Sequence, residues 1–150
     1  MEPRIIVREP FTILGVMTRI TRGTETPGLF VGIWQQFEAN RQTVAALARG
    51  THYFGVNLPT DHEDVTDYVA GMVVDDDATV PQGLEKRRVP GGRFVVIECP
   101  VGAIGDTYRH IFTVWLREAA VEFDPAAPVF EEYPPDAPPQ PVRIHVPVRG

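Results

Sequence analysis

The feature that most restricts the fold of this chain is an internal repeat with a period of about 80 residues. A bent strand interrupted by proline, a helix and two further strands occupy about residues 4–76, and the same series recurs over about residues 84–148. Each half has one helix and too little apolar surface to fold alone. The repeat therefore predicts a single α+β domain, residues 1–150, in which duplicated strand–helix–strand–strand halves pack about a pseudo-twofold axis. We expect an antiparallel-rich sheet with a ligand cleft at the seam.

Two segments have the apolar periodicity of helices, and the others that of strands. Helices are expected at residues 29–48, with Gly50 as the C-cap residue, and at residues 106–120, with Asp106 or Thr107 as the N-cap residue. The expected strands cover residues 4–6, 11–20, 52–58, 66–74, 84–89, 93–99, 129–133 and 142–148. The prolines of residues 134–139 predict a stiff connection between the last two strands.

Charge and cysteine content exclude several classes of protein. The net charge is −6, whereas phosphate binding needs a basic face, so no direct contact with nucleic acid is expected. The single cysteine, Cys99, allows no internal disulfide and fits a reducing compartment. The N-terminus lacks the charged and apolar regions of a signal peptide, and no apolar run reaches the roughly 18–20 residues of a membrane span. These features predict a soluble, cytoplasmic protein without a membrane partner.

Glu131 is the strongest candidate for a functional residue. Strand alternation places Glu131 and Tyr133 on one face of their strand, and Phe130 and Glu132 on the other. If Phe130 faces the helix layer, Glu131 and Tyr133 face the opposite side. A carboxylate beside aromatic rings in a concave site attracts a lipophilic cation through charge and cation–π contact. Spacing alone also allows the alternative that both glutamates are solvated near the surface.

Four further residues are candidates for the wall of such a pocket. Tyr68 and Met72 alternate along one strand with the small Ala70 between them, which leaves room beside the tyrosine, although ordinary packing against a helix is equally compatible. Trp34 and Trp115 occupy comparable places in the two helices. An aromatic stripe on a helix usually belongs to the core, but a tryptophan at the seam can be both core and pocket wall.

The sequence carries no pattern typical of a cofactor or metal site. The acidic run around His62 resembles a solvated loop, and His52, His110 and His145 lack the spacing of paired ligands. Glycine-rich phosphate-binding motifs and the nucleophile elbow are absent from the sequence. No metal and no cofactor are expected. We expect Cys99, which precedes Pro100 on a strand, to be a buried inert thiol.

Taken together, these candidate residues and the repeat resemble those of the GyrI-like proteins, also called AraC-type effector-binding domains. The resemblance rests on the duplicated halves, on the order and spacing of short motifs, and on nearly the whole chain. The matching stretches are Pro27-Gly28-Leu29, Ile33-Trp34-Gln35-Gln36-Phe37, Tyr53-Phe54-Gly55-Val56, Tyr68-Val69-Ala70-Gly71, Trp115-Leu116, Phe130-Glu131-Glu132-Tyr133 and Ile144-His145-Val146-Pro147-Val148.

The resemblance implies a bacterial protein, related to multidrug binding and transcription regulation, with a pocket between its halves for bulky and often cationic molecules. The family's motif glutamate maps onto Glu131. Many relatives carry a DNA-binding helix-turn-helix, whereas this chain begins at its first strand, so direct activity as a transcription factor is not expected. Some standalone relatives hydrolyse cyclopropane-bearing compounds with a pocket glutamate and aromatic residues. The proline-rich loop at residues 134–141 departs from many relatives and is expected to reshape the pocket.

Three functions remain open at this point. The leading one is the binding or sequestering of a small, aromatic or cationic organic molecule by Glu131, Tyr133, Tyr68, Met72, Trp34 and Trp115. The second is hydrolysis of a reactive lipophilic compound, with Glu131 as the base and Tyr68 or Tyr133 assisting. The third is a module that docks on a protein partner, which the acidic surface favours. A deep apolar cavity would favour the first two.

Overall fold

The computed structural model describes residues 2–135 and 141–149. The first half contains strands β1 (Arg4–Arg8) and β2 (Phe11–Thr21), helix α1 (Leu29–Ala45), and strands β3 (Tyr53–Pro59) and β4 (Val65–Val74). The second contains β5 (Glu85–Val89), β6 (Gly92–Cys99), a helical segment, β7 (Val129–Tyr133) and β8 (Val142–Pro147). The helical segment consists of η1 (Val101–Ala103), α2 (Ile104–His110), η2 (Ile111–Trp115) and α3 (Leu116–Glu118). Nothing in this segment or in α1 is long and apolar enough to span a membrane.

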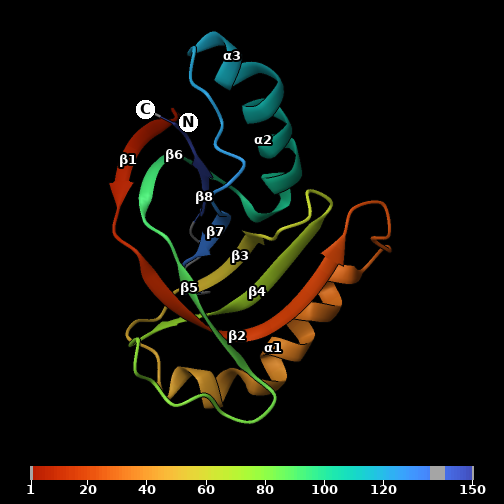
Figure 1. Cartoon of the computed structure of the whole chain (residues 1–150), viewed down its shortest axis with the longest axis vertical. Coiled ribbons are helices and arrows are strands. Elements are labelled where there is room, and N and C mark those ends of the chain that lie inside the picture. The colour runs from red at the N-terminus through yellow and green to blue at the C-terminus, as the bar shows by residue number, and fades with distance from the viewer. Residues whose placement is uncertain (1, 136–140, 150) are drawn as a thin grey trace.

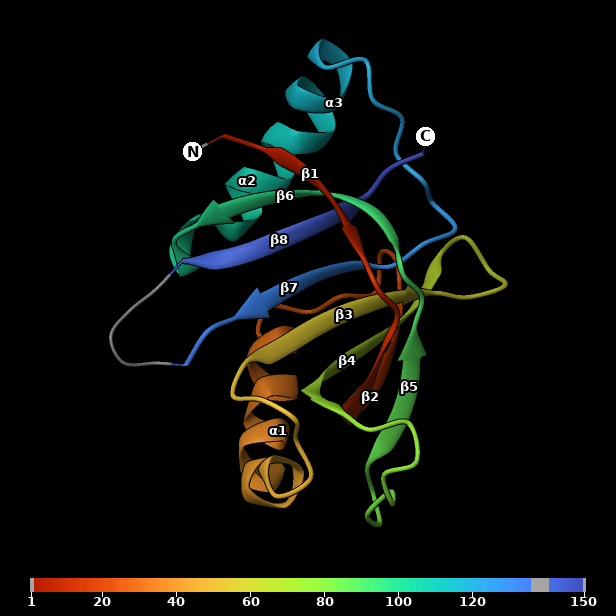
Figure 2. The ribbon, with the colours of Figure 1, turned by 90° about the vertical axis from the view of Figure 1, so that its left-hand side faces the viewer.

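The strand order confirms the α+β class and the symmetry that the repeat predicts. Eight strands form one curved sheet in the order β1-β6-β8-β7-β3-β4-β2-β5, and every paired neighbour is antiparallel. Read from either end, this order exchanges β1 with β5, β6 with β2, β8 with β4 and β7 with β3. The first strand of each half therefore pairs with the other half, and β3 and β7 meet at the centre (Figures 1 and 2).

The helices cover the outer strands of each half and not its centre. Helix α1 packs on β2 and β4, while α2 packs on β6 and β8. In Figure 2 the two helices lie at opposite ends of the sheet, with β7 and β3 between them. This arrangement leaves the β3–β7 ladder open on the helix side, where a cavity is lined by residues of both strands.

Phe130 belongs to the other face of the sheet, so the possibility that it faces the helix layer is wrong. Its ring packs among Phe11, Phe54 and Phe94 in a cluster that no helix covers within the described residues. The curvature of the sheet brings β1, β2 and β6 over this face, so strands alone enclose the cluster. Strand alternation holds, and Glu131 and Tyr133 consequently lie on the helix side.

Both helices depart from their expected ends. Helix α1 ends at Ala45 and Gly50 is not its cap, because the amides of Leu47 and Ala48 form tighter turns and the Arg49 amide bonds the Val73 carbonyl on β4. The second helical segment begins at Val101, before Asp106 and Thr107. The ring of Pro100 restricts the backbone just before the segment begins. The Pro100 carbonyl then accepts the first backbone hydrogen bond of the segment, from the Ala103 amide.

Residues 111–115 form a π-helical turn, which 3.6-residue periodicity does not predict. The extra residue rotates the end of the segment, so that Ile111 and Leu116 are buried while Phe112 is 41% exposed. The expected stiff connection at residues 134–139 falls mostly on residues 136–140, which lie outside the described residues.

Candidate ligand-binding site

The central cavity lies over the β3–β7 ladder and has a volume of about 850 Å³. This volume is within the range of pockets that take drug-sized ligands. Elements of both halves form its wall, as the seam of a duplicated fold requires. The lining residues are Phe30, Val31, Trp34, Gln35, Glu38, Asn57, Tyr68, Ile104, Gly105, Tyr108, Glu131 and Tyr133.

Glu131 is the only carboxylate of this cavity that is buried, with 7% of its surface exposed. The Tyr108 hydroxyl donates a hydrogen bond to one carboxylate oxygen, and the Tyr133 hydroxyl donates to the other at 3.2 Å. Burial disfavours the charged form and raises the pKa of Glu131 to about 7, although the two tyrosine hydrogen bonds partly oppose that shift. Near neutral pH the cavity therefore holds a carboxyl group that gains or loses its charge readily.

Aromatic groups enclose this carboxyl group. Trp34 Nε1 donates a hydrogen bond of 3.1 Å to the Tyr68 hydroxyl, and the Phe30 ring meets the Tyr68 ring edge-on at 5.1 Å. Burial and the Glu131 charge both raise the pKa values of Tyr68, Tyr108 and Tyr133. The three phenols consequently stay protonated, as hydrogen-bond donors or acceptors and as cation–π surfaces.

Gly55 leaves the space in which these groups meet. It lies opposite Glu131 in the β3–β7 register. A Cβ atom at residue 55 would stand 2.2 Å from the Tyr68 hydroxyl oxygen and 3.3 Å from Glu131 Oε1. Only glycine therefore allows the tyrosine hydroxyl and the carboxylate to approach the sheet at this point.

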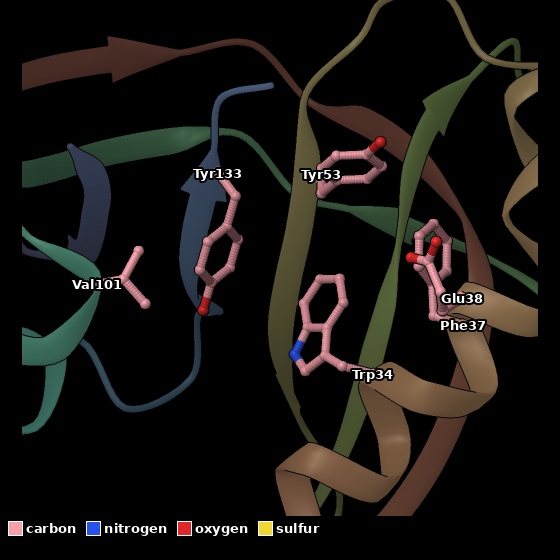
Figure 3. Close-up of a pocket in the computed structure, with 6 residues that line it drawn as sticks. All are labelled: Trp34, Phe37, Glu38, Tyr53, Val101 and Tyr133. Carbon is pink, nitrogen blue, oxygen red and sulfur yellow. The ribbon is translucent and has the colours of Figure 1, made fainter. Parts of the chain in front are cut away.

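A smaller hollow of about 320 Å³ continues the cavity past Tyr133 (Figure 3). Tyr133 from β7 faces Trp34 from α1, with ring centroids 5.4 Å apart, and Tyr53 lies beyond Trp34. Trp34, Glu38 and Tyr133 line both hollows. The aromatic wall thus extends from the carboxylate toward Tyr53, the first residue of β3.

Four of the six residues expected at the site line the cavity: Glu131, Tyr133, Tyr68 and Trp34. Met72 does not, because it lies four residues beyond Tyr68 on β4, where α1 covers the sheet and leaves Met72 3% exposed in the core. Trp115 does not either, since it lies at the end of the π-helical turn, partly buried, and packs against the core formed with β6 and β8. Sequence reasoning missed Tyr108, which lies within the second expected helix, and also Gly55 and Asn57.

Glu132 belongs to a different cluster on the opposite face of the sheet. Its carboxylate contacts Arg8 at 3.3 Å and His52 at 2.7 Å. Burial favours the neutral form, but Arg8 and the two histidines His52 and His145 hold the pKa of Glu132 below its usual range. Burial, reinforced by Arg8, lowers the pKa of His145 to about 4. This self-compensated cluster ties β1, β7 and β8 together.

The remaining candidate groups form no second site of this kind. Cys99 is buried, and its burial raises the pKa of its thiol. Across residues 2–135 and 141–149, no three acidic, histidine or cysteine side chains are close enough to hold a metal ion. The chemistry of the site therefore rests on one carboxyl group and its aromatic neighbours.

A duplicated α+β fold with an aromatic cavity at its seam defines the class as a GyrI-like effector-binding protein. The sequence matches the Cass2 family, described as integron-associated effector binding protein, over residues 4–148. The chain therefore belongs to this family. No curated protein matches the sequence.

Three solved structures illustrate the range of similar folds. SAV2435 bound to tetraphenylphosphonium has a TM-score of 0.84 and 16% identity, over 100% of this chain and 95% of that chain. The integron cassette protein VCH_CASS2 of Vibrio cholerae has a TM-score of 0.69 and 15% identity, over 98% and 95%. A hydrolase from Listeria innocua has a TM-score of 0.58 and 12% identity, over 99% and 92%. At these identities the likeness establishes the fold.

Proposed function

We propose that this protein binds bulky lipophilic cations in the central cavity, with Glu131 as the anchor for their charge. Membership of an effector-binding family supports small-molecule binding in general. The observation that carries the specific proposal is a buried carboxyl group without a cationic partner. Among the described residues, no arginine, lysine or histidine forms an ion pair with Glu131.

The energetics of this carboxyl group favour a cation. A carboxylate that has lost water is compensated only in part by the hydroxyls of Tyr108 and Tyr133. A lipophilic cation restores the missing compensation and has little hydration of its own to lose. The rings of Trp34, Tyr68 and Tyr133 offer it cation–π contact, and the net charge of −6 attracts it over longer distances.

We place this activity in a cytoplasmic sensor or sequestering protein that uses both halves, residues 1–150, as one unit. SAV2435 supports the choice of ligand, since a related fold is bound there to tetraphenylphosphonium. An open cavity also favours a small-molecule ligand over the alternative of a module that docks on a protein partner. That alternative predicts a filled or flat seam, which the cavity of about 850 Å³ does not match.

Calorimetric titration with tetraphenylphosphonium and the neutral triphenylphosphine oxide tests the role of Glu131. We expect Glu131→Gln to weaken binding of the cation by about 1–3 kcal/mol, the range of a charge-assisted contact, and binding of the neutral compound much less. Glu122→Gln, an exposed position outside the cavity, is the control for the change in net charge. Equal losses for both ligands would mean that Glu131 acts through shape.

A hydrolase is the second candidate, favoured by the raised pKa of Glu131. A carboxylate whose pKa is about 7 is matched to general-base chemistry near neutral pH. Glu131 would take a proton from water, whose oxygen attacks a strained ring carbon. The electrons of the breaking C–C bond would pass to an adjacent carbonyl, whose enolate oxygen accepts a hydrogen bond from the Tyr68 hydroxyl. The proton held by Glu131 would then pass to the carbon that the ring opening releases, which restores the carboxylate. Glu131-dependent consumption of an activated cyclopropane, without stable binding of cations, would replace the binding proposal with this one.

A further inference from the structure

Three hollows follow one another along the β3–β7 ladder. The register pairs Tyr53 with Tyr133, Gly55 with Glu131, and Asn57 with Val129, and these alternate residues share the helix side of the sheet. Tyr53 and Tyr133 line a hollow of about 320 Å³, and Glu131, with Gly55 opposite it, lines the central one of about 850 Å³. Asn57 and Val129 line a third, of about 560 Å³.

The central cavity is therefore the middle of a longer groove. From Tyr53 to Asn57 the strand advances about 13 Å, at roughly 3.3 Å per residue. Both ends extend this distance, because the third hollow continues to the β3–β4 connection and to Phe123, Pro125 and Ala126. A compact cation over Glu131 fills only the middle of such a groove.

The two ends of the groove differ in chemistry. Trp34, Phe37 and Tyr53 make the first end aromatic. The third hollow instead combines the Phe123 ring with polar and charged groups, which include Thr60, Asp61 and Arg22. An asymmetric groove of this kind distinguishes one arm of a ligand from the other.

Asn57 stands at the boundary of the central and third hollows, and lines both. Its Nδ2 donates a hydrogen bond of 3.2 Å to the Val129 carbonyl, which fixes the orientation of the amide. The amide oxygen accepts no hydrogen bond from any residue between 2 and 135 or 141 and 149, so it can accept one from a ligand that passes over the side chain.

We propose that the preferred ligands are elongated, asymmetric amphipathic cations. The charged centre lies over Glu131, an apolar arm extends along Tyr53, and an arm with a hydrogen-bond donor passes Asn57 into the third hollow. Asn57 is then a specificity-determining residue, because its amide oxygen accepts a hydrogen bond only from a ligand whose arm carries a donor. This inference rests on the proposed binding of cations at Glu131 and adds the shape and polarity of the ligand.

Three probes test it by calorimetric titration: tetraphenylphosphonium, a triphenylphosphonium with an alkyl arm of about 8 Å ended by a primary amide, and the same compound ended by methyl. Ala126→Trp fills the third hollow from an exposed position. Ala119→Trp is the matched control, since Ala119 is exposed beyond α3 and lines none of the three hollows.

We expect Ala126→Trp to weaken the amide-ended probe roughly tenfold or more, tetraphenylphosphonium by less than about twofold, and Ala119→Trp to change neither. Asn57→Leu should abolish the preference for the amide over the methyl end. If tetraphenylphosphonium binds the wild type but Ala126→Trp leaves the amide-ended probe unchanged, the elongated groove is wrong and the proposed function stands. If none of the cations binds the wild type, both fail.

Discussion

Lowering the pH from 8 to 6 should weaken the binding of a lipophilic cation to this protein. Glu131 is buried in the central cavity, with 7% of its surface exposed, and this burial raises its pKa to about 7. The cation is attracted to the ionised carboxylate and not to the neutral acid. Protonation therefore removes the binding-competent form within this pH range.

The magnitude follows from the fraction of Glu131 that is ionised. With a pKa of about 7, roughly nine-tenths of the groups are charged at pH 8 and roughly one-tenth at pH 6. Because apparent affinity is proportional to the competent fraction, the association constant should fall about tenfold, or about 1.4 kcal/mol. Binding at pH 6 should also release close to one proton per cation, since most of the carboxyl groups must ionise.

Titration of tetraphenylphosphonium in two buffers of different ionisation enthalpy measures both quantities. The affinity gives the pH dependence, and the difference in apparent enthalpy gives the number of protons released. Glu131→Gln should remove the pH dependence and the proton release together. An affinity that stays constant from pH 8 to 6, or a pH dependence that survives in Glu131→Gln, would refute the assignment of the charge to this residue.

Three further predictions concern the fold and its pocket. Gly55→Ala should displace the Tyr68 hydroxyl and lower the free energy of unfolding in urea by about 1–3 kcal/mol, whereas Gly32→Ala, with open space around it, should raise it slightly. Glu131→Gln should stabilise the fold by about 2–3 kcal/mol at pH 8 and by little near pH 4.5. The pKa of Glu131 is raised in the folded protein, so the wild type loses stability as the pH rises toward that pKa, and the glutamine variant does not. Asp67→Asn should lower the free energy of unfolding by about 2 kcal/mol at neutral pH and by less near pH 3. Arg19 and Arg87 lower the pKa of Asp67, so its negative charge stabilises the fold only at pH values above that pKa. Thermal melts at both pH values measure the difference.

The fold could be predicted largely from the internal repeat, because the order of strands and helix in one half also gives the order in the other half. Helix ends could not be predicted in the same way. Residues 46–48 favour a longer helix by local preference, but the hydrogen bond from the Arg49 amide to the Val73 carbonyl holds the chain against β4 instead. The end of α1 is thus a tertiary effect, and periodicity reports only local structure.

The site could be predicted only in part, and the missing residues have a common cause. Glu131 and Tyr133 follow from strand alternation, which survives the curvature of the sheet. Tyr108 and Trp115 lie on a helical segment whose π-helical turn shifts the face presented to the seam. Both side chains pack against the same core, but of the two only Tyr108 also reaches the cavity, where its hydroxyl donates a hydrogen bond to Glu131.

The central ladder shows how a symmetric scaffold builds an asymmetric site. The two-fold relation of the halves aligns Phe54 of β3 with Phe130 of β7, and both rings pack on the strand-covered face of the sheet. The next residues in each strand are then Gly55 and Glu131, which the register places opposite each other. Two glutamates at this point would repel across the ladder, and a side chain on residue 55 would collide with Tyr68. One half consequently supplies the charge and the other supplies the space, so substitution of either residue should impair the same binding event by a different physical route.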